Sequence, residues 1–489
     1  MTRARWSSRT IFLFAAIGSA VGLGNIWRFP YLTHKFGGGA FLVPYLIALL
    51  VLGVPLLILE FAIGQKLQKG AVDAFKTVHH KLAGIGIGSL LAAFMVVVYY
   101  AAVMAWSLVY LINSFQPSLP WAADSSAYFF TGVLQLSEGV GMLGGINWTL
   151  FAALALVWLL IYFSVWKGVK SVGKIVAITM PLPLILLVIL FVRGITLDGA
   201  LTGILYYLTP DFSALLSTEI WIAAASQIFF TLSLAFGIMV AYASYNKETQ
   251  DVLGDAYITS IANSAISLFA GFVVFSILGY MATNTGLGIE EVVAAGPGLA
   301  FVVFPEALSL MPWGNFFSVL FFLTLLTLGI DSAFSLVESV NTAVMDRRSN
   351  EKDLRKIAAI VCGSAFLLGI LFVTNAGLYF LDIIDHFITN FGLILFGIFE
   401  CLAIGWVYGA DKLRTYINST SRFKLGAWWN WSIKVVIPAI LTVLLISQFM
   451  IELQGPYGGY PLWAITIGWI SVALPLLFAF VPLVHKQKV

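Results

Sequence analysis

Long apolar runs, separated by short polar segments, dominate this chain. A helix needs about 20 apolar residues to cross a bilayer, and twelve of the runs reach that length. A weaker run at 287–308, which contains Gly-Pro-Gly and Pro305, predicts a helical loop outside the membrane. The predicted membrane-spanning helices cover residues 10–34, 38–64, 84–114, 148–166, 172–193, 221–245, 255–283, 314–346, 356–374, 377–407, 430–451 and 463–485.

Two of these predicted helices carry polar and flexible residues in their middle. The first contains SAVGLGNIWRFP at residues 19–30, and the sixth contains QIFFTLSLAFGIMVAY at residues 227–242. Every backbone polar group inside lipid must find a partner, and a charged side chain at mid-membrane costs about 2.5–3.5 kcal/mol. These two runs therefore predict interrupted helices. Glycines that pack closely against a neighbouring helix are the alternative.

The positions of the two interruptions indicate an internal symmetry. The first and sixth helices each begin a half of five helices, and interruptions at corresponding positions favour an inverted-repeat transporter with its site at the midplane. The predicted fold is an all-α integral membrane protein of about 12 transmembrane helices, a five-plus-five inverted repeat with helices 1 and 6 unwound. The predicted divisions are an N-terminal cytoplasmic segment, two repeats, and a final helix pair with a cytoplasmic C-terminus: residues 1–9, 10–193, 194–407 and 408–489.

Composition excludes several classes of protein. The chain is 60% hydrophobic and 10% charged, whereas a soluble domain has about 25% charged residues. The net charge of +3 comes with no basic stripe, so we expect no nucleic-acid partner. Neither HExxH nor GxSxG occurs, and we expect no enzyme activity. Cys362 and Cys401 both lie in apolar runs and predict buried residues rather than a disulfide.

The distribution of basic residues predicts the orientation. If the N-terminus is cytoplasmic, all of the 26 lysines and arginines except Arg28, Lys35 and Arg193 lie at cytoplasmic loops or helix ends. The positive-inside rule therefore places both termini in the cytoplasm. The leading MTRARWSSR runs directly into a spanning helix, so we expect no cleavable signal peptide. The predicted location is the plasma (inner) membrane.

Several long motifs resemble one known family. GSAVGLGNIWRFPY at residues 18–31 and the following GGGAFLVPYLIALLVLGVPLLILEFAIGQ resemble the signature of the neurotransmitter:sodium symporters. QIFFTLSLAFG, ANSAISLFAGFVVFSILGYMA and FFLTLLTLGIDSAFSLVE resemble the family's helices 6, 7 and 8. The resemblance implies a sodium-coupled carrier that works by alternating access, similar to a bacterial leucine transporter whose helices are broken at the binding site. A sodium-gated channel would instead show a continuous polar stripe.

The resemblance implies two sodium sites. The first would use the Ala20 carbonyl, Asn25, Thr231 and Asn263, together with the substrate carboxylate. A helix–helix hydrogen bond is the alternative role for the two asparagines, and a protonated acid is the alternative for Asp331. The second site would use the carbonyls of Gly18, Val21 and Leu328 with the side chains of Asp331 and Ser332.

The resemblance also predicts the substrate class. Gly22 stands where amine carriers of the family have an acidic residue, so it leaves room for a substrate carboxylate, to which the Tyr100 hydroxyl would donate. No side chain that resembles a substrate contact is ionisable apart from this tyrosine, which predicts a neutral, apolar amino acid, because an unpaired buried charge is costly. An amine or amino-acid derivative is the alternative. Ala235 replaces a glycine of some amino-acid carriers. The remaining predicted substrate positions are Ala20, Leu23, Gly24, Val96, Phe230, Thr231, Ser233, Phe236, Ser332 and Leu336.

An anion site is a further prediction. Ser267 stands where chloride-independent bacterial relatives have a carboxylate, four residues after Asn263 and on the same helix face. Tyr45, Gln227 and Thr231 match the groups that surround chloride in animal relatives. The hypothesis is that chloride supplies the negative charge that a carboxylate would otherwise provide. The alternative is that Asp331 supplies enough charge and Ser267 bonds to its own helix.

Two gates complete the predicted mechanism. At the outer end Arg28 would pair with Asp385, above a lid formed by Phe230 and Tyr100. At the inner end, Arg3 and Trp6 would face Asp346 and Tyr245. Gly173 and Pro183 match the spacing of the family's site of local unwinding. The implied partners are sodium, a small amino-acid substrate and the lipid bilayer, and the sequence leaves the oligomeric state open.

Overall fold

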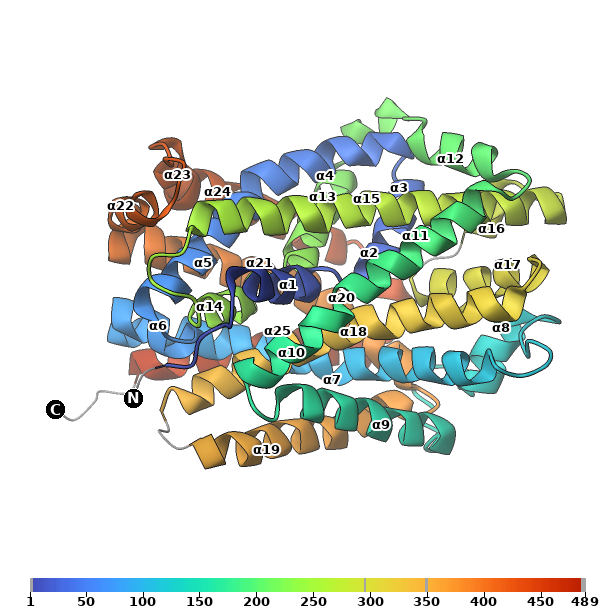
Figure 1. Cartoon of the computed structure of the whole chain (residues 1–489), viewed down its shortest axis with the longest axis horizontal. Helices are drawn as coiled ribbons and strands as arrows, with labels where there is room; N and C mark the ends of the chain where they lie inside the picture. Colours follow the sequence, from blue (N-terminus) through green and yellow to red (C-terminus); the bar gives the residue numbers. More distant parts are fainter. Residues whose placement is uncertain (1–2, 294–295, 348–350, 485–489) are drawn as a thin grey trace.

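The computed structural model describes residues 3–293, 296–347 and 351–484, and these residues form helices joined by turns. Three long helices run lengthwise through the molecule (Figure 1): α7 (Ala83–Asn113), α15 (Val252–Thr285) and α18 (Gly314–Met345). The shorter α11 (Pro181–Ile195) crosses them obliquely and packs against both α15 and α18. The helical fold predicted from the apolar runs is confirmed.

Ten helices of the described residues are long and apolar enough to cross a membrane, and a bent helix pair makes an eleventh span. They correspond to the predicted runs with one exception. The predicted sixth span, 221–245, is missing from this set because it is divided into two short helices. The ten spans are Gly39–Leu67, His80–Asn113, Trp148–Val165, Val169–Ile195, Val252–Thr285, Gly314–Met345, Asp353–Val373, Gly377–Thr420, Trp428–Gly459 and Leu462–Phe480.

The first predicted helix is broken where its glycines are. α1 (Arg9–Ala20) ends at an extended Val21, and α2 (Leu23–Ile26) starts after an equally extended Gly22. The two halves of the span, α1 and the segment Leu23–Lys35 that contains α2 and α3 (Arg28–Lys35), meet at an angle of 63°. The break therefore places unpaired helix ends inside the bundle, as the glycine-rich pattern predicts.

The sixth predicted helix is also broken, and here the backbone is more unusual. α13 (Thr218–Thr231) and α14 (Ile238–Ala243) are separated by a non-helical segment, residues 232–237. Ser233 and Ala235 have φ angles of 54° and 62°, a left-handed conformation that costs an L-residue about 1–2 kcal/mol. The amide of Ala235 donates a 2.8 Å hydrogen bond to a carboxylate oxygen of Glu60, on α5 (Val54–Leu67).

Short helices gather at the two ends of the bundle (Figure 1). The predicted extramembrane stretch 287–308 is largely helical, although residues 294–295 lie outside the described residues. The helix that begins at Gly377 continues to Thr420, beyond its predicted end at 407. The predicted terminal segments include residues 1–2 and 485–489, which also lie outside the described part. The short helices are α6 (Ala71–Val78), α8 (Ser125–Ala127), α12 (Ala200–Leu208), α16 (Ile289–Val292), α17 (Phe304–Leu310), α22 (Ala410–Thr420) and α23 (Trp428–Trp431).

Candidate functional site

A small cavity of about 30 Å³ lies where the two helix breaks meet. Both broken spans contribute to its wall, and α7 and α18 close it from the other side. Of the predicted substrate positions, all but Leu23 line this cavity. Tyr100 carries the one titratable group among the lining side chains. The lining residues are Ser19, Ala20, Gly22, Gly24, Asn25, Val96, Tyr100, Phe230, Thr231, Ser233, Phe236, Ile238, Ser332 and Leu336.

One end of the cavity is shaped by a glycine. A Cβ atom at Gly22 would lie 2.7 Å from the Ser332 hydroxyl and 3.0 Å from the Tyr100 hydroxyl. The Tyr100 oxygen accepts a 3.1 Å hydrogen bond from the amide of Leu23, so its own proton is free to point toward a ligand. This end therefore offers a donor beside an open stretch of backbone, which suits an acidic group.

A cluster of hydroxyl groups extends from this end of the cavity and includes Ser332. The Ser19 carbonyl accepts hydrogen bonds from the hydroxyls of Ser233, at 3.0 Å, and Ser332, at 3.3 Å. The Ser19 and Ser233 hydroxyls are themselves 3.3 Å apart. Our sequence reasoning missed Ser19 and Ile238. The signal for Ser19 was its place in the interrupted motif, directly before Ala20. The cluster gives the cavity oxygen atoms that can accept from a cationic group.

The predicted first sodium ligands converge in a buried polar cluster. Asn25 donates to the side-chain oxygen of Asn263 at 3.0 Å, and the Thr231 hydroxyl lies 3.1 Å from the same oxygen. Asn25 accepts from the Gly22 amide at 2.9 Å, which ties the cluster to the helix-1 break. Oxygen atoms are the ligands that hard cations prefer. These residues therefore fit a sodium ion.

The predicted second sodium site surrounds a buried carboxylate. Asp331 is 1% exposed, and no described residue donates to its Oδ1 atom. A Cβ atom at Gly18 would lie 2.7 Å from Asp331 Oδ2, so the end of α1 is pressed against this carboxylate. A buried carboxylate oxygen without a donor fits a cation or a proton. The same stretch of α18 carries the other predicted ligands Leu328 and Ser332, and Val21 follows α1.

The described residues contain no group of three or more His, Cys, Asp or Glu side chains that could hold a metal ion. The donor set at both predicted sodium sites consists of hydroxyl, amide, carbonyl and single carboxylate oxygens. Such oxygen ligands favour a hard monovalent cation over a transition metal.

The predicted chloride residues lie in the same region. Tyr45 donates a 3.2 Å hydrogen bond to Ser264, a residue that our sequence reasoning did not select. The Ser267 hydroxyl accepts from Asn25 at 2.7 Å and donates to the Asn263 carbonyl at 3.2 Å. Gln227 is fully buried, and neither polar atom of its amide has a partner among the described residues.

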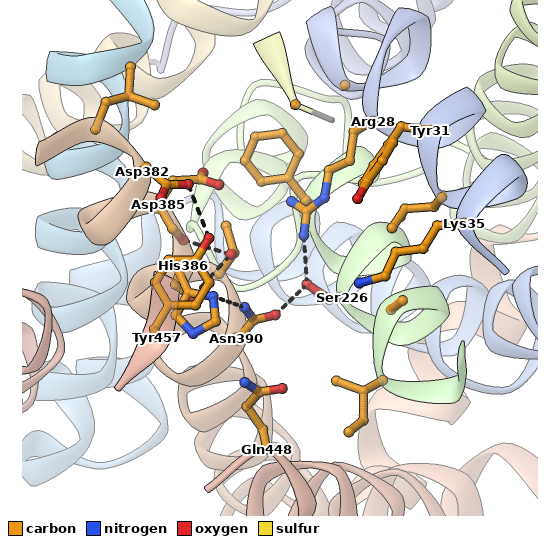
Figure 2. A pocket seen from close by; sticks show the side chains of 18 of the residues that line it. Arg28, Tyr31, Lys35, Ser226, Asp382, Asp385, His386, Asn390, Gln448 and Tyr457 are labelled. Carbon is orange, nitrogen blue, oxygen red and sulfur yellow. Dashed lines mark hydrogen bonds between the residues drawn. The ribbon is translucent and has the colours of Figure 1, made fainter. Parts of the chain in front are cut away.

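A vestibule of about 710 Å³ leads to the cavity (Figure 2). Tyr100 and Phe230 line both spaces and so form the floor of the vestibule, as predicted for a lid. Figure 2 shows Arg28 and Lys35 on one wall and Asp382, Asp385 and His386 on the facing wall. Opposite charges thus face each other across an open space.

The predicted outer pair takes a different form from the one we expected. Arg28 donates to Ser226 at 3.1 Å and stacks over the Phe230 ring, while Asp385 accepts from Tyr99 at 2.6 Å. Both residues of the predicted pair are described, and each has another partner because the open vestibule separates the two walls. The Ser226 hydroxyl donates onward to Asn390 at 3.1 Å, which belongs to the opposite wall.

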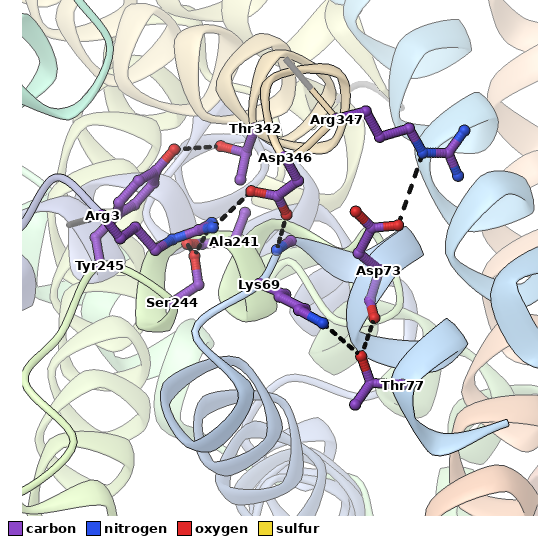
Figure 3. A network of polar contacts seen from close by, with 11 residues as sticks. Arg3, Lys69, Asp73, Thr77, Ala241, Ser244, Tyr245, Thr342, Asp346 and Arg347 are labelled. Carbon is purple, nitrogen blue, oxygen red and sulfur yellow. Dashed lines mark hydrogen bonds and ion pairs between the residues drawn. The ribbon is translucent and has the colours of Figure 1, made fainter. Parts of the chain in front are cut away.

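The opposite end of the molecule is closed (Figure 3). Arg3 forms a 2.5 Å ion pair with Asp346, donates to Ser244 at 2.7 Å and stacks over the Tyr245 ring. Trp6 donates to the Tyr242 carbonyl at 2.8 Å. The predicted inner-gate residues are therefore brought together.

One buried acid between the sodium residues and this closed end escaped our sequence reasoning. Glu338 follows Asp331 by seven residues on α18, which places both on one helix face. Its side chain is 1% exposed, and its Oε2 atom has no donor among the described residues. The seven-residue spacing was the available signal.

Comparison with known proteins identifies the family. The model of the Sodium:neurotransmitter symporter family matches residues 3–128 and 122–489. The chain belongs to this family. The resemblance inferred from the helix-1 and helix-6 motifs is thereby confirmed, and so are sodium-dependent transport as the general activity and the absence of an enzyme role.

Relatives in this family match the chain over nearly its full length. An uncharacterized sodium-dependent transporter of Methanocaldococcus jannaschii is 42% identical over 100% of this chain and 98% of its own length. The creatine transporter of Torpedo marmorata is 39% identical over 97% of the chain and 84% of its own length. The sodium- and chloride-dependent taurine transporter of Canis lupus familiaris is 37% identical over 99% and 84%, respectively.

Proposed function

We propose that this symporter carries a small zwitterionic amino-acid derivative into the cell together with sodium. The observation that carries the proposal is the Ser19–Ser233–Ser332 hydroxyl cluster, which lies in the same cavity as the open backbone at Gly22. The acidic group would lie at Gly22, Tyr100 and Ser332, and the cationic group at the Ser19 and Ser233 hydroxyls. The purely apolar side chain that the sequence predicts would make no hydrogen bond with this cluster.

The substrates named for the relatives support an amino-acid derivative rather than an apolar amino acid. Creatine carries a carboxylate and a guanidinium, and taurine carries a sulfonate and an ammonium, so each combines an acid with a separated cationic nitrogen. A simple amine fits less well, because among the described lining residues no carboxylate faces the cavity. A zwitterion needs no charged side chain there, since sodium can neutralise its acidic group.

Sodium coupling would use two ions. Asn25, Thr231 and Asn263, with the Ala20 carbonyl and the substrate acid, would hold the first ion. Asp331 and Ser332, with the carbonyls of Gly18, Val21 and Leu328, would hold the second. The membrane potential contributes about 2.3 kcal/mol per charge per 100 mV. Because the residues at the helix-1 break serve both sodium and substrate, sodium binding would order the substrate site.

Alternating access supplies the mechanism. The open vestibule and the closed Arg3–Asp346 end support an outward-facing state, with Arg28 pairing with Asp385 once substrate is bound. The excess of basic residues at the Arg3 end supports cytoplasmic termini and a plasma-membrane location. The two interrupted spans support an inverted repeat formed by residues 10–193 and 194–407.

Uptake into proteoliposomes tests the substrate assignment. Taurine, creatine and β-alanine should accumulate with an inward sodium gradient and fail to accumulate with potassium in its place, whereas leucine should not compete. Gly22→Ala should abolish uptake because its Cβ would overlap Ser332 and Tyr100. Gly363→Ala is the matched control, since nothing lies within 4 Å of a Cβ there. Concentrative leucine uptake that these compounds fail to inhibit would refute the assignment.

Chloride is a second element of the proposal. The buried, unpartnered amide of Gln227 supports an anion site, because a halide would provide the acceptor that a buried N–H requires. The Ser267 hydroxyl bonds to the Asn263 carbonyl of its own helix, as the alternative role predicts. Replacement of chloride by gluconate should reduce uptake. Ser267→Glu should remove this dependence because it supplies a fixed negative charge. Equal uptake in chloride and in gluconate by the unsubstituted protein would contradict the chloride site and would leave the substrate assignment unaffected.

A further inference from the structure

A chain of hydrogen bonds runs along the vestibule and ends at the outer arginine (Figure 2). Arg28 donates to Ser226 at 3.1 Å, and Ser226 donates to the side-chain oxygen of Asn390 at 3.1 Å. The side-chain nitrogen of Asn390 lies 3.2 Å from His386 Nδ1. At the far end of the chain, His386 Nε2 lies 2.7 Å from Glu452 Oε1.

The chain joins parts of the fold that are distant in sequence. Arg28 begins α3, and Ser226 lies on α13. His386 lies on α20 (Gly377–Phe387), whereas its carboxylate partner ends α24 (Ile437–Glu452). The outer arginine is thereby connected to a helix outside both predicted repeats.

The direction of the hydrogen bonds is fixed at both ends of the chain. A guanidinium can only donate, and an ionised carboxylate can only accept. Ser226 accepts from Arg28, so its own proton is available for Asn390. Asn390 then presents an N–H to His386 Nδ1, which leaves the ring proton on Nε2, toward Glu452. Every donor in this chain meets an acceptor while the histidine is neutral.

A proton on His386 disturbs this order. Imidazole is the side chain that changes charge between about pH 5 and pH 8. H⁺ taken up from the vestibule water at Nδ1 turns this atom into a donor, which then faces the N–H of Asn390. If the Asn390 amide turns around, its N–H faces Ser226, whose oxygen meets two donors and whose proton loses its acceptor. The hydrogen bond from Arg28 to Ser226 is weakened as a result.

We propose that His386 and Asn390 are positioning residues for the outer arginine: the neutral histidine keeps Arg28 on Ser226 in the open state, and the protonated histidine releases it for closure. This inference rests on the part that Arg28 takes in the proposed transport cycle. The released guanidinium has Asp385 on the facing wall as its next partner. Acidic conditions at the vestibule should therefore favour closure.

Other charged groups share the vestibule with the histidine. Water fills the space between the two walls and screens a direct repulsion between His386 and Arg28, so we expect the hydrogen bonds to decide the direction of the effect. On α20 itself, Asp385 accepts from Tyr99, and Asp382 accepts from Tyr457 and Tyr460. The titratable groups on other elements that line the vestibule include Glu452, Tyr31, Lys35 and Glu219.

Alkylation of a vestibule cysteine in the full-length protein tests the proposal. Ala223→Cys places the reporter on the vestibule wall, and both native cysteines are buried. With sodium and without substrate, acidification from about pH 7.5 to about pH 5.5 should slow the reaction. The slowing should be about fivefold greater than in the same reporter carrying His386→Gln, the effect of one hydrogen bond. This comparison removes the effect of pH on the thiol itself.

The matched control is a second histidine on the same side of the molecule. His34 bonds to Tyr206 and does not line the vestibule, so His34→Gln should keep the full pH response. An equal pH response with and without His386→Gln would overturn the proposal. So would a smaller slowing in the protein that retains His386 than in His386→Gln.

Asn390→Asp separates the hydrogen-bonded chain from a direct effect of charge. Its carboxylate can accept from Ser226 and from the protonated histidine at the same time. Arg28 should then stay on Ser226 at both pH values, and the pH response should disappear although His386 is present. A full response in this variant would overturn the proposal. Because no substrate is used, failure of taurine and creatine uptake would refute the substrate assignment and leave this result standing.

Discussion

The two ends of the molecule each present an arginine to an aspartate, with opposite results. At the inner end Arg3 is bound on several sides, by Asp346, Ser244 and the Tyr245 ring. At the outer end Arg28 rests on Ser226 and the Phe230 ring, and the vestibule separates it from Asp385. The same two residue types therefore form an ion pair at one end and remain apart at the other.

This difference shows what decides whether such a pair forms. The Arg3 and Asp346 side chains are 18% and 8% exposed, so water screens their attraction little. Asp346 also accepts from the Gly70 amide at 2.6 Å, which joins α18 to the start of α6. Arg28 has neutral partners that it can leave at small cost. The outer end can thus close readily, whereas the inner end must break several contacts to open.

The largest effect is expected from the outer arginine. Arg28→Lys should reduce sodium-dependent uptake about 100-fold, because a lysine cannot replace the forked guanidinium in a pair that becomes buried on closure. Sodium-dependent substrate binding to the open state should persist. Lys35→Ala, on the same vestibule wall, is the control and should transport normally. Normal uptake by Arg28→Lys would show that the outer end closes without this pair.

A smaller effect is expected at the inner end. Arg3→Ala should shift the equilibrium toward an inward-open state about tenfold, since it removes a partly buried, charge-assisted pair. The rate at which a cysteine introduced by Ser335→Cys is alkylated from the cytoplasmic side reports this shift, because Ser335 is fully buried on α18. Arg347→Ala should change the rate less than about twofold, since Arg347, which pairs with Asp73 at 3.7 Å (Figure 3), is 57% exposed. Equal alkylation rates in Arg3→Ala and Arg347→Ala would contradict the view that the Arg3–Asp346 pair holds its end of the molecule closed.

The smallest effect is expected from the open-state partner of Arg28. Ser226→Ala should free Arg28 and favour outer closure about fivefold, the effect of one hydrogen bond. Alkylation of a cysteine introduced by Ala223→Cys, on the vestibule wall, should slow accordingly. Faster alkylation would mean that Ser226 promotes closure instead.

The sequence predicted the breaks better than it predicted their contacts. Gly22 and Gly24 marked the helix-1 break because glycine next to polar residues is costly in a continuous membrane helix, and the structure has its break there. The contact between Glu60 and Ala235 joins residues 175 positions apart, and no local pattern encodes it. The sequence shows Ala235 in place of a glycine of some amino-acid carriers, but it does not predict the left-handed backbone that the structure has there.

The separation of Arg28 and Asp385 could not be predicted from the sequence for another reason. A motif can match Arg28 and Asp385 as partners, but the proposed transport cycle has several states and a single sequence does not select among them. The same limit applies to Ser19, whose role depends on Ser233 and Ser332 being brought to its carbonyl by two other helices. Sequence therefore proposed residues for the site, and the structure shows which of them touch.

The backbone of residues 232–237 has a consequence for biogenesis. Exposed to lipid, its free amide and carbonyl groups would be costly, so residues 218–243 should enter the membrane as one continuous helix. In the folded protein Glu60 accepts the Ala235 amide, so we expect the helix to unwind when α5 packs against this segment. The broken form is therefore the product of assembly, and a nascent chain that lacks this carboxylate should be retained by quality control as a straight, transport-incompetent bundle.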